Sequence, residues 1–401
     1  MIDVSLLYCG SASGSAPHRY GLAVRQDLPA HQRMAVARSA AGRRPVVVWN
    51  VTRTCNLRCV HCYTNSDARQ YPGELSTDEA RGVIDDLAAF GVPVVLFSGG
   101  EPLMRPDIDE LIGQVRDHGL HAVLSTNGTL IDKAVAERLA GLTVTYVGLS
   151  LDSAEPATHD GFRGTPGAFE RTMRGFDAAR EAGLKTGLRL TLTRTTYEGL
   201  DGVFDFLEDR RIPRACFYHL VPTGRGTAEA GLSLAESRRA VEVILRRTRE
   251  LHDRGATTEV LTVDNHCDGP LIYLTLRAAS DPRAEAVHRM LTFNGGGLWS
   301  SGVGIACIDE TGGVHPDQFS RHAVLGNVRE RPFSAIWTDE SNELLAGLRD
   351  RKPRIKGRCA SCRFLDQCGG SLRVRAELVT GDVWAADPGC YLSDEEIAGD
   401  A

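Results

Sequence analysis

The sequence predicts an α/β fold in which parallel strands alternate with helices, and two observations predict it. Six segments rich in β-branched or aromatic residues are bounded by Gly, Pro or Asn, as strands commonly are. Amphipathic helical patterns lie between them, and a chain that alternates in this way forms a parallel sheet. Right-handed crossovers then close the units into either a doubly wound sheet or an incomplete barrel. The expected strands are 46–53, 93–98, 121–126, 145–151, 187–193 and 216–221.

The helices of this array follow the strands in order. Ser76-Thr77-Asp78-Glu79 is a capping box, in which the serine and glutamate side chains satisfy free backbone N–H groups, and it starts a helix that ends near Phe90. A longer helix at 234–254 follows a Gly/Ala-rich exit from the array at 224–236. The remaining helices are expected at 107–118, 132–139, 168–181 and 197–208.

These patterns divide the 401 residues into four parts. Residues 1–44 form an N-terminal arm with little periodicity, and 45–230 hold the array of strands and helices. Residues 231–300 form a helical linker, and 301–401 form a small C-terminal domain with a hairpin near 304–316.

Composition excludes several classes of protein. With 42% hydrophobic and 24% charged residues, the chain is neither disordered nor fibrous. The net charge of −6 provides no basic field for nucleic acid. No apolar run approaches the roughly 20 residues that cross a bilayer, and the N-terminus lacks the pattern of an export signal. We therefore expect a cytoplasmic protein that binds neither nucleic acid nor a membrane.

Polar residues collect where the predicted strands end. Such residues also cap helices and form turns, which explains any one group on its own. The carboxyl ends of parallel strands share one edge, where ligands bind, so four groups in register predict a site there. The groups are Ser98-Gly99-Gly100-Glu101, Ser125-Thr126-Asn127-Gly128, Ser150 with Asp152, and His219.

Three of the 11 cysteines lie just beyond the first strand, as Cys55-x3-Cys59-x2-Cys62. A loop at this position can turn three thiolates toward one point. Iron–sulfur clusters are held by thiolates and usually take four, so three leave one iron open to a small chelating molecule. The alternative is a structural zinc ion with His61 as the fourth ligand.

A second cysteine group, Cys359-x2-Cys362-x5-Cys368 with Cys390, supplies four thiolates near the C-terminus. Four ligands suit either structural zinc or a complete [4Fe–4S] cluster, and the spacing alone does not decide between them. The remaining cysteines are expected to be buried apolar residues. The exception is Cys307, which together with His315 is a candidate to face a substrate.

The first cysteine group, followed by Gly99-Gly100-Glu101-Pro102, resembles the radical S-adenosylmethionine (SAM) enzymes, and the resemblance covers residues 46–223. It implies a partial (βα)6 barrel in which Cys55, Cys59 and Cys62 hold a [4Fe–4S] cluster whose open iron binds S-adenosyl-L-methionine. One-electron reduction would then cleave SAM to methionine and a 5′-deoxyadenosyl radical that takes a hydrogen atom from the substrate.

The same resemblance implies which residues form the SAM pocket. Glu101 would accept a hydrogen bond from the ammonium group of SAM, and His61 would lie beside the adenine. Gly99 and Gly100 would allow close approach of the backbone to the methionine part of SAM. Arg189 would bind the SAM carboxylate. The other lining residues would be Ser125, Asn127, Ser150 and Asp152.

Attached to such a barrel, the second cysteine group resembles the SPASM or related twitch extensions, which favours iron–sulfur over zinc. The full SPASM pattern provides ligands for two auxiliary clusters. Here Asp317 and Leu372 stand where two of its cysteines are expected. The resemblance therefore implies one auxiliary [4Fe–4S] cluster, held by Cys359, Cys362, Cys368 and Cys390, and two clusters in total.

Longer segments, among them LFSGGEPLMRPD and GDVWAADPGCYLSDEEI, resemble the radical SAM proteins of alternative haem and haem d1 biosynthesis. The N-terminal LLYCG…HRYG is more similar to the branch that removes acetate side chains from 12,18-didecarboxysiroheme to give iron-coproporphyrin. The resemblance implies an enzyme that breaks C–C bonds on a tetrapyrrole, with reduced ferredoxin or flavodoxin as electron donor. Side chains that could meet the substrate's carboxylates or iron are Arg163, Arg189, Arg225, Arg321, His219, His266, His315 and His322.

Two other functions fit parts of the pattern. Auxiliary clusters also occur in radical SAM maturases that modify ribosomally made peptides. Those enzymes often carry an N-terminal winged-helix module, for which residues 1–44 are too short and too weakly helical. A third possibility is a non-catalytic iron–sulfur scaffold.

Overall fold

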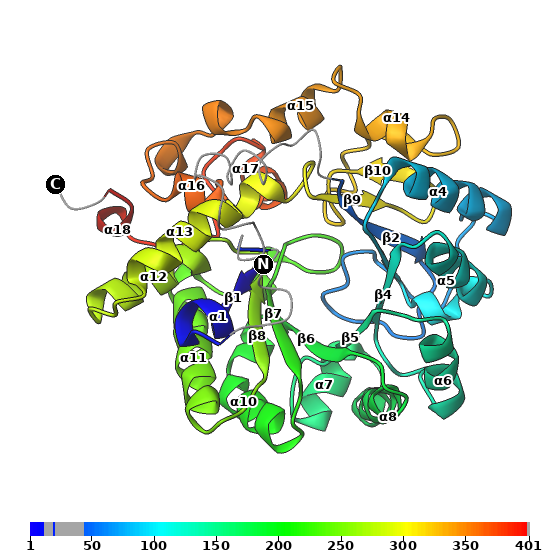
Figure 1. Ribbon diagram of the computed structural model, residues 1–401, viewed down its shortest axis with the longest axis horizontal. Helices are drawn as coiled ribbons and strands as arrows, with labels where there is room; N and C mark the ends of the chain where they lie inside the picture. The colour runs from blue at the N-terminus through cyan, green and yellow to red at the C-terminus, as the bar shows by residue number, and fades with distance from the viewer. Residues whose placement is uncertain (12–18, 21–43, 399–401) are drawn as a thin grey trace, which may run out of the picture.

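The structure, a computed structural model, describes residues 1–11, 19–20 and 44–398, and it is built on one mixed sheet of 11 strands (Figure 1). All six predicted strands form and pair in parallel in chain order, which confirms the α/β class. The sheet stays open, with short strands at both edges. The six strands are β2 (Val46–Thr52), β3 (Val94–Gly99), β4 (His121–Thr126), β5 (Tyr146–Ser150), β6 (Thr186–Leu192) and β7 (Arg214–His219).

The helices between these strands begin near the predicted positions. The predicted capping box starts α4 (Thr77–Phe90): the Ser76 side chain accepts from the Glu79 N–H, and the Glu79 carboxylate accepts from the Ser76 N–H. A short helix that the patterns do not predict, α7 (Pro156–Arg163), begins with a proline at its first position, where a missing N–H costs nothing. The others are α5 (Ile108–Asp117), α6 (Lys133–Gly141), α8 (Ala168–Glu181), α9 (Arg194–Tyr197) and α10 (Leu200–Asp209).

Buried aromatic side chains pack neighbouring strands against each other and against the helices. Trp49 on β2 stacks on Phe97 of β3 with ring centroids 6.1 Å apart, and Phe217 on β7 stacks on Phe204 of α10 at 5.3 Å. Burial of a side chain of this size stabilises the folded chain by about 1.5–3 kcal/mol. The strands are therefore rigidly supported behind the edge where the polar residues gather.

Residues 231–300, a predicted helical linker, contain a seventh parallel strand. After α11 (Leu234–Asp253), β8 (Glu259–Val263) pairs in parallel with β7, and β1 (Ile2–Asp3) adds to β8 in the antiparallel direction. The sequence patterns do not single out this strand, which pairs with β7 along its whole length. It brings the residues after Val263 to the same edge as the other strand ends. The helices α12 (Asp268–Ala278) and α13 (Ala284–Asn294) follow.

The C-terminal residues extend the sheet on its other side. β9 (Ile305–Ile308) pairs in parallel with β2 and forms the predicted hairpin with β10 (Gly313–His315), to which β11 (Gly326–Asn327) adds. Short helices lead back across the molecule, and α16 packs against α12 and α13 (Figure 1). These helices are α14 (Phe333–Trp337), α15 (Glu343–Arg349), α16 (Leu365–Cys368), α17 (Arg373–Thr380) and α18 (Asp394–Ala398).

Most of the predicted N-terminal arm, 1–44, lies outside the described residues. Its described part contains β1 and the short helix α1 (Val4–Cys9), which packs against α11 and β8. In the described part of the chain, no helix has both the length and the apolar character to cross a membrane.

Candidate active site

The loop after β2 carries Cys55, Cys59 and Cys62. Backbone N–H groups point at two of the sulfurs, from Leu57 to Cys55 and from Ser66 to Cys62, each at 3.4 Å. Burial raises the pKa of the Cys55 thiol to about 12, and the other two thiols add to the rise. A bound cationic iron centre would reverse this effect and favour the thiolates. Three sulfurs, two of them with backbone N–H donors aimed at them, therefore suit an iron–sulfur cluster.

The same residues do not form a site for a single ion. Among the described residues, no three His, Cys, Asp or Glu side chains have the geometry to hold one metal ion. His61, the alternative zinc ligand, stacks on Phe162 with ring centroids 4.4 Å apart, and burial lowers its pKa to about 4. The thiolates of a four-iron cluster each bind a different iron and do not converge on one point. The arrangement gives the zinc alternative no support.

A buried ion pair supports the cysteine loop from behind. Arg163, at the end of α7, donates from Nη1 to the Cys59 sulfur at 3.6 Å and pairs with the Asp152 carboxylate. Burial alone would raise the pKa of Asp152, but the Arg163 guanidinium holds it below its usual range. Asp152 also accepts from the Thr191 N–H at 3.0 Å. Asp152 thus acts on the loop through Arg163.

Gly99 and Gly100 are required by the close approach of two backbone segments. A Cβ atom on Gly99 would lie 2.3 Å from the Thr52 carbonyl oxygen, and one on Gly100 would lie 2.2 Å from that of Thr54. Gly99 also has a φ of +117°, which favours glycine. The glycines hold the end of β3 against the start of the cysteine loop, and their contact with the methionine part of SAM stays a prediction.

The Glu101 carboxylate is fully buried and connects two strand ends. It accepts from the Asn127 N–H and the Thr126 hydroxyl, each at 2.8 Å, and from the Leu103 N–H at 3.2 Å. Burial raises its pKa to about 7 although these hydrogen bonds lower it. Each carboxylate oxygen has more than one lone pair, so Glu101 can still accept from an ammonium group. Its contact with SAM also stays a prediction.

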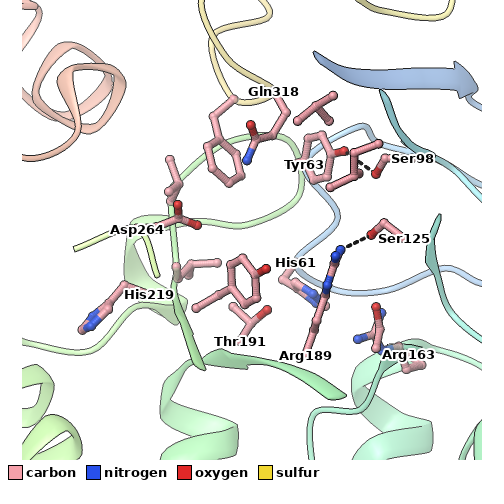
Figure 2. A pocket seen from close by; sticks show the side chains of 17 residues that line it. His61, Tyr63, Ser98, Ser125, Arg163, Arg189, Thr191, His219, Asp264 and Gln318 are labelled. Atoms are coloured by element: carbon pink, nitrogen blue, oxygen red, sulfur yellow. Dashed lines mark hydrogen bonds between the residues drawn. The ribbon is translucent and has the colours of Figure 1, made fainter. Parts of the chain in front are cut away.

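One cavity lies at the carboxyl ends of the strands (Figure 2). Ser125, Ser150 and Arg189, all predicted for the SAM pocket, line it. Arg189 donates to the Ser125 hydroxyl, while its buried Nε has no hydrogen-bond partner among the described residues. Gly148 makes room for this guanidinium, because a Cβ atom there would lie 2.3 Å from Nε. An unused N–H of a guanidinium at a cavity wall suits a carboxylate ligand.

The other residues assigned to the SAM pocket support this wall and do not line it. Asn127, for example, donates from Nδ2 to Asn56 Oδ1 at 2.8 Å and so connects β4 to the cysteine loop. The supporting residues are Gly99, Gly100, Glu101, Asn127 and Asp152.

The cavity wall also contains residues that sequence patterns do not single out. Tyr63 follows the last cysteine of the loop, Tyr218 lies on β7, and Asp264 follows β8. Gln318 and Phe319 come from the segment after β10. Asp264 is not predicted because the strand before it, β8, is not predicted. The hairpin of β9 and β10 comes close to this site only in the folded chain. The tyrosine next to Cys62 is the one signal that the sequence offers.

The two catalytic candidates, Cys307 and His315, lie on the hairpin and outside the cavity wall. Both are fully buried. The His315 ring contacts the Asp309 carboxylate through Nε2 at 2.9 Å and the Ala323 carbonyl through Nδ1 at 3.1 Å. The Cys307 sulfur accepts from Asn50 Nδ2 at 3.6 Å, and burial raises the pKa of the thiol. A catalytic role for either stays a prediction.

Two of the arginines predicted to bind a substrate make other contacts in the structure. Arg225 donates to the Cys59 carbonyl at 2.8 Å, and Arg321 pairs with Glu310. Arg163, Arg189 and His219 do line the cavity, whereas His266, His315 and His322 do not.

The second thiol group lies in the C-terminal part. Burial raises the pKa of the Cys368 thiol, and Cys390, Cys359 and Cys362 add to the rise, as expected if the four lie together. A fifth thiol, Cys267, hydrogen-bonds with Cys390 and lowers the pKa of Cys390 to about 7. The spacing of the second cysteine group gives no indication of Cys267, because this residue lies far earlier in the sequence, between β8 and α12.

The two positions that depart from the full SPASM pattern have roles of their own. Asp317 accepts from the N–H groups of Phe319 and Ser320, each at 2.9 Å. Leu372 is buried beside Val221. Neither position offers a thiol, which agrees with a single auxiliary cluster.

Comparison with known proteins gives matches over nearly the whole chain. The family described as the Radical SAM superfamily matches residues 49–207, and the SPASM iron-sulfur cluster-binding domain matches residues 300–363. Fe-coproporphyrin III synthase from Methanosarcina barkeri is 52% identical over 99% of both chains. Pre-heme d1 synthase from Dinoroseobacter shibae is 39% identical over 88% of this chain and 87% of its own.

Among solved structures, SuiB from Streptococcus suis bound to S-adenosylmethionine superposes with a TM-score of 0.68. The match covers 94% of this chain and 86% of SuiB at 21% sequence identity. The likeness confirms the fold class.

Proposed function

The chain belongs to the radical SAM superfamily and carries a SPASM iron–sulfur domain, and from this premise we propose that it removes acetate side chains from an iron tetrapyrrole. The substrate is 12,18-didecarboxysiroheme and the product is iron-coproporphyrin. The observation that carries the proposal is the 52% identity with Fe-coproporphyrin III synthase over 99% of both chains. The 39% identity with pre-heme d1 synthase supports a tetrapyrrole substrate more broadly.

The residues of the site suit the cofactors of this family. The three cysteines of the loop after β2 would hold a [4Fe–4S] cluster with one open iron, and SAM would lie in the cavity beside Ser125, Ser150 and Arg189. When bound, these groups supply a one-electron cleavage of SAM that yields a radical able to take a hydrogen atom from the substrate. The chain itself binds and orients the reactants and excludes water.

Arg189 and Arg163 give the cavity wall two positive charges with different uses. Arg189 has a free Nε and would bind the carboxylate of SAM. Arg163 is already paired with Asp152 and donates to Cys59, so it would orient the cluster loop. The substrate's own carboxylates would contact the polar groups that Tyr63, Tyr218 and Gln318 offer in the cavity wall.

The second thiol group supports one auxiliary [4Fe–4S] cluster. Cys359, Cys362, Cys368 and Cys390 would hold it, and Asp317 and Leu372 leave a second auxiliary cluster without its ligands. Reduced ferredoxin or flavodoxin would supply the electrons, in the cytoplasm.

The test is anaerobic incubation of the reconstituted protein with 12,18-didecarboxysiroheme, SAM and a reductant. We expect the mass of the tetrapyrrole to fall in two steps, one for each acetate, with a change in the visible spectrum. Cys62→Ala should abolish both the mass change and the formation of 5′-deoxyadenosine, because the SAM-binding cluster loses a ligand.

Three results would contradict the proposal. Modification of a peptide with no change in the tetrapyrrole would favour a maturase. Tightly bound zinc without SAM cleavage would favour a structural scaffold. Full activity in Cys62→Ala would overturn the cluster assignment.

A further inference from the structure

Asp264 occupies an unusual backbone position at the rim of the cavity. It directly follows β8 and has a φ of +66°, in the left-handed region that aspartate and asparagine adopt more often than other residues with a side chain. Arg375 of α17 holds this backbone by donating from Nη1 to the Asp264 carbonyl at 2.9 Å, while its other nitrogens pair with Asp387.

The Asp264 carboxyl group faces the cavity with an unused oxygen. The residue is 9% exposed, and its Oδ2 atom is buried without a hydrogen-bond partner among the residues that the structure describes. Figure 2 shows Asp264 across the cavity from Ser98 and Ser125. Because an unpaired buried polar atom is unfavourable in the free protein, this oxygen is suited to a bound substrate.

The arginines and tyrosines of the cavity wall are poor proton donors. The guanidinium groups of Arg163 and Arg189 stay protonated in proteins. Burial raises the pKa of Tyr218 above the usual value, and the Tyr63 hydroxyl donates to Asn50 Oδ1 at 2.8 Å. These four side chains can bind a substrate, but each is a weaker acid than a carboxyl group.

The two histidines of the wall are engaged in other contacts. The His61 ring stacks on Phe162 with ring centroids 4.4 Å apart. His219 directs its ring away from the cavity (Figure 2), with Nε2 3.0 Å from the Asp268 carboxylate. Asp264 is the one carboxylic acid among the described side chains that line the cavity, which makes it the candidate to carry a proton to the substrate.

The role of Asp264 rests on the proposed function, in which each reacting ring loses a carboxymethyl group and the hydrogen atom of the neighbouring ring carbon. Once the hydrogen atom is removed, the C–C bond breaks homolytically, a ring C=C bond forms and a carboxymethyl radical is freed. This radical becomes acetate when it takes one electron from a reduced iron–sulfur centre and one proton. We propose that the Asp264 carboxyl group donates this proton and is then reprotonated from solvent.

Several charged groups set the protonation state of Asp264. Burial raises its pKa to about 6, and Asp317 adds to the rise. The amino group of Met1, Arg375 and His219 lower it. The acid therefore keeps its proton at slightly acidic pH and loses it as the pH rises through about 6.

The test is a single-turnover reaction of the reconstituted full chain with 12,18-didecarboxysiroheme, run anaerobically in D2O. Wild-type protein should release acetate that carries one solvent deuterium, as measured by mass spectrometry. Asp264→Asn should form 5′-deoxyadenosine within about threefold of the wild-type rate but release acetate about 100-fold more slowly, since a general acid contributes about 10²–10⁴-fold. Asparagine tolerates the left-handed backbone, so this variant preserves the fold.

The matched control is Asp209→Asn, which changes an exposed carboxylate at the end of α10 and should behave as wild type. Wild-type acetate release should decline as the pH rises through about 6, and this dependence should vanish in Asp264→Asn. Acetate without solvent deuterium, or wild-type release from Asp264→Asn, overturns the role of Asp264 and leaves the proposed function intact. If the wild-type protein with both clusters releases no acetate, both proposals fall.

Discussion

Replacement of Asp152 by asparagine should destabilise the folded chain through its effect on Arg163. The Arg163 side chain is 8% exposed and that of Asp152 is fully buried, so Asp152→Asn leaves a buried guanidinium without its counter-charge. Removal of one partner from a buried ion pair costs about 3–5 kcal/mol. The asparagine oxygen can still accept from the Thr191 N–H, which places the expected loss near the lower limit.

A double-mutant cycle with Arg163→Gln isolates the contribution of the pair. Equilibrium unfolding in urea, followed by circular dichroism, would give the free energy of unfolding for the wild type, both single variants and the double variant. The double variant should be less destabilised than the sum of the single variants, because it contains no unpaired buried charge. Losses that add to within about 0.5 kcal/mol would refute this account of the pair.

The same pair predicts the direction of a pH effect. The pKa of Asp152 is lower in the folded chain than its ordinary value, so its ionised form stabilises the fold above the unfolded pKa of about 3.9. This stabilisation is lost as the pH falls through the depressed folded pKa. The stability difference between wild type and Asp152→Asn should therefore be full at neutral pH and shrink in acid. A constant difference down to low pH would contradict it.

Two further substitutions test the cavity wall and the second thiol group. Gly148→Ala should displace Arg189, because the new Cβ atom would lie 2.3 Å from Nε, and it should weaken SAM binding about tenfold or more, measured by calorimetry. Gly141→Ala, with open space around its Cβ atom, is the control, and equal affinities in both variants would contradict the role of Gly148. Cys368→Ala should lower the iron content from about eight to about four atoms per chain while 5′-deoxyadenosine still forms, and an unchanged iron content would argue against a cluster there.

The strands and helices of the barrel could be predicted because their signals are local. The alternation of strand and helix patterns places β2 to β7, and the box that starts at Ser76 gives the first residue of α4. The cysteine loop and the serines at the strand ends are also local features. Ser125 and Ser150 reach the cavity because they lie at the carboxyl ends of adjacent parallel strands.

The rest of the cavity depends on contacts between distant parts of the chain. Asp264 and Gln318 line the same cavity because β8 joins β7 on one side of the sheet and β9 joins β2 on the other. Neither pairing has a signal within a few residues. The role of Arg163 behind Cys59 likewise depends on α7, a helix of eight residues whose position becomes apparent only in the folded chain.

The contact of Arg375 with the Asp264 carbonyl bears on how this protein can be recombined with others. Arg375 and its partner Asp387 belong to the C-terminal part of the chain, yet they anchor a peptide group on the rim of the barrel. The C-terminal helices therefore cannot be replaced without an effect on the barrel. A chimaera that joins this barrel to another auxiliary module would keep strands β2 to β8 but lose the contact that holds the backbone of Asp264.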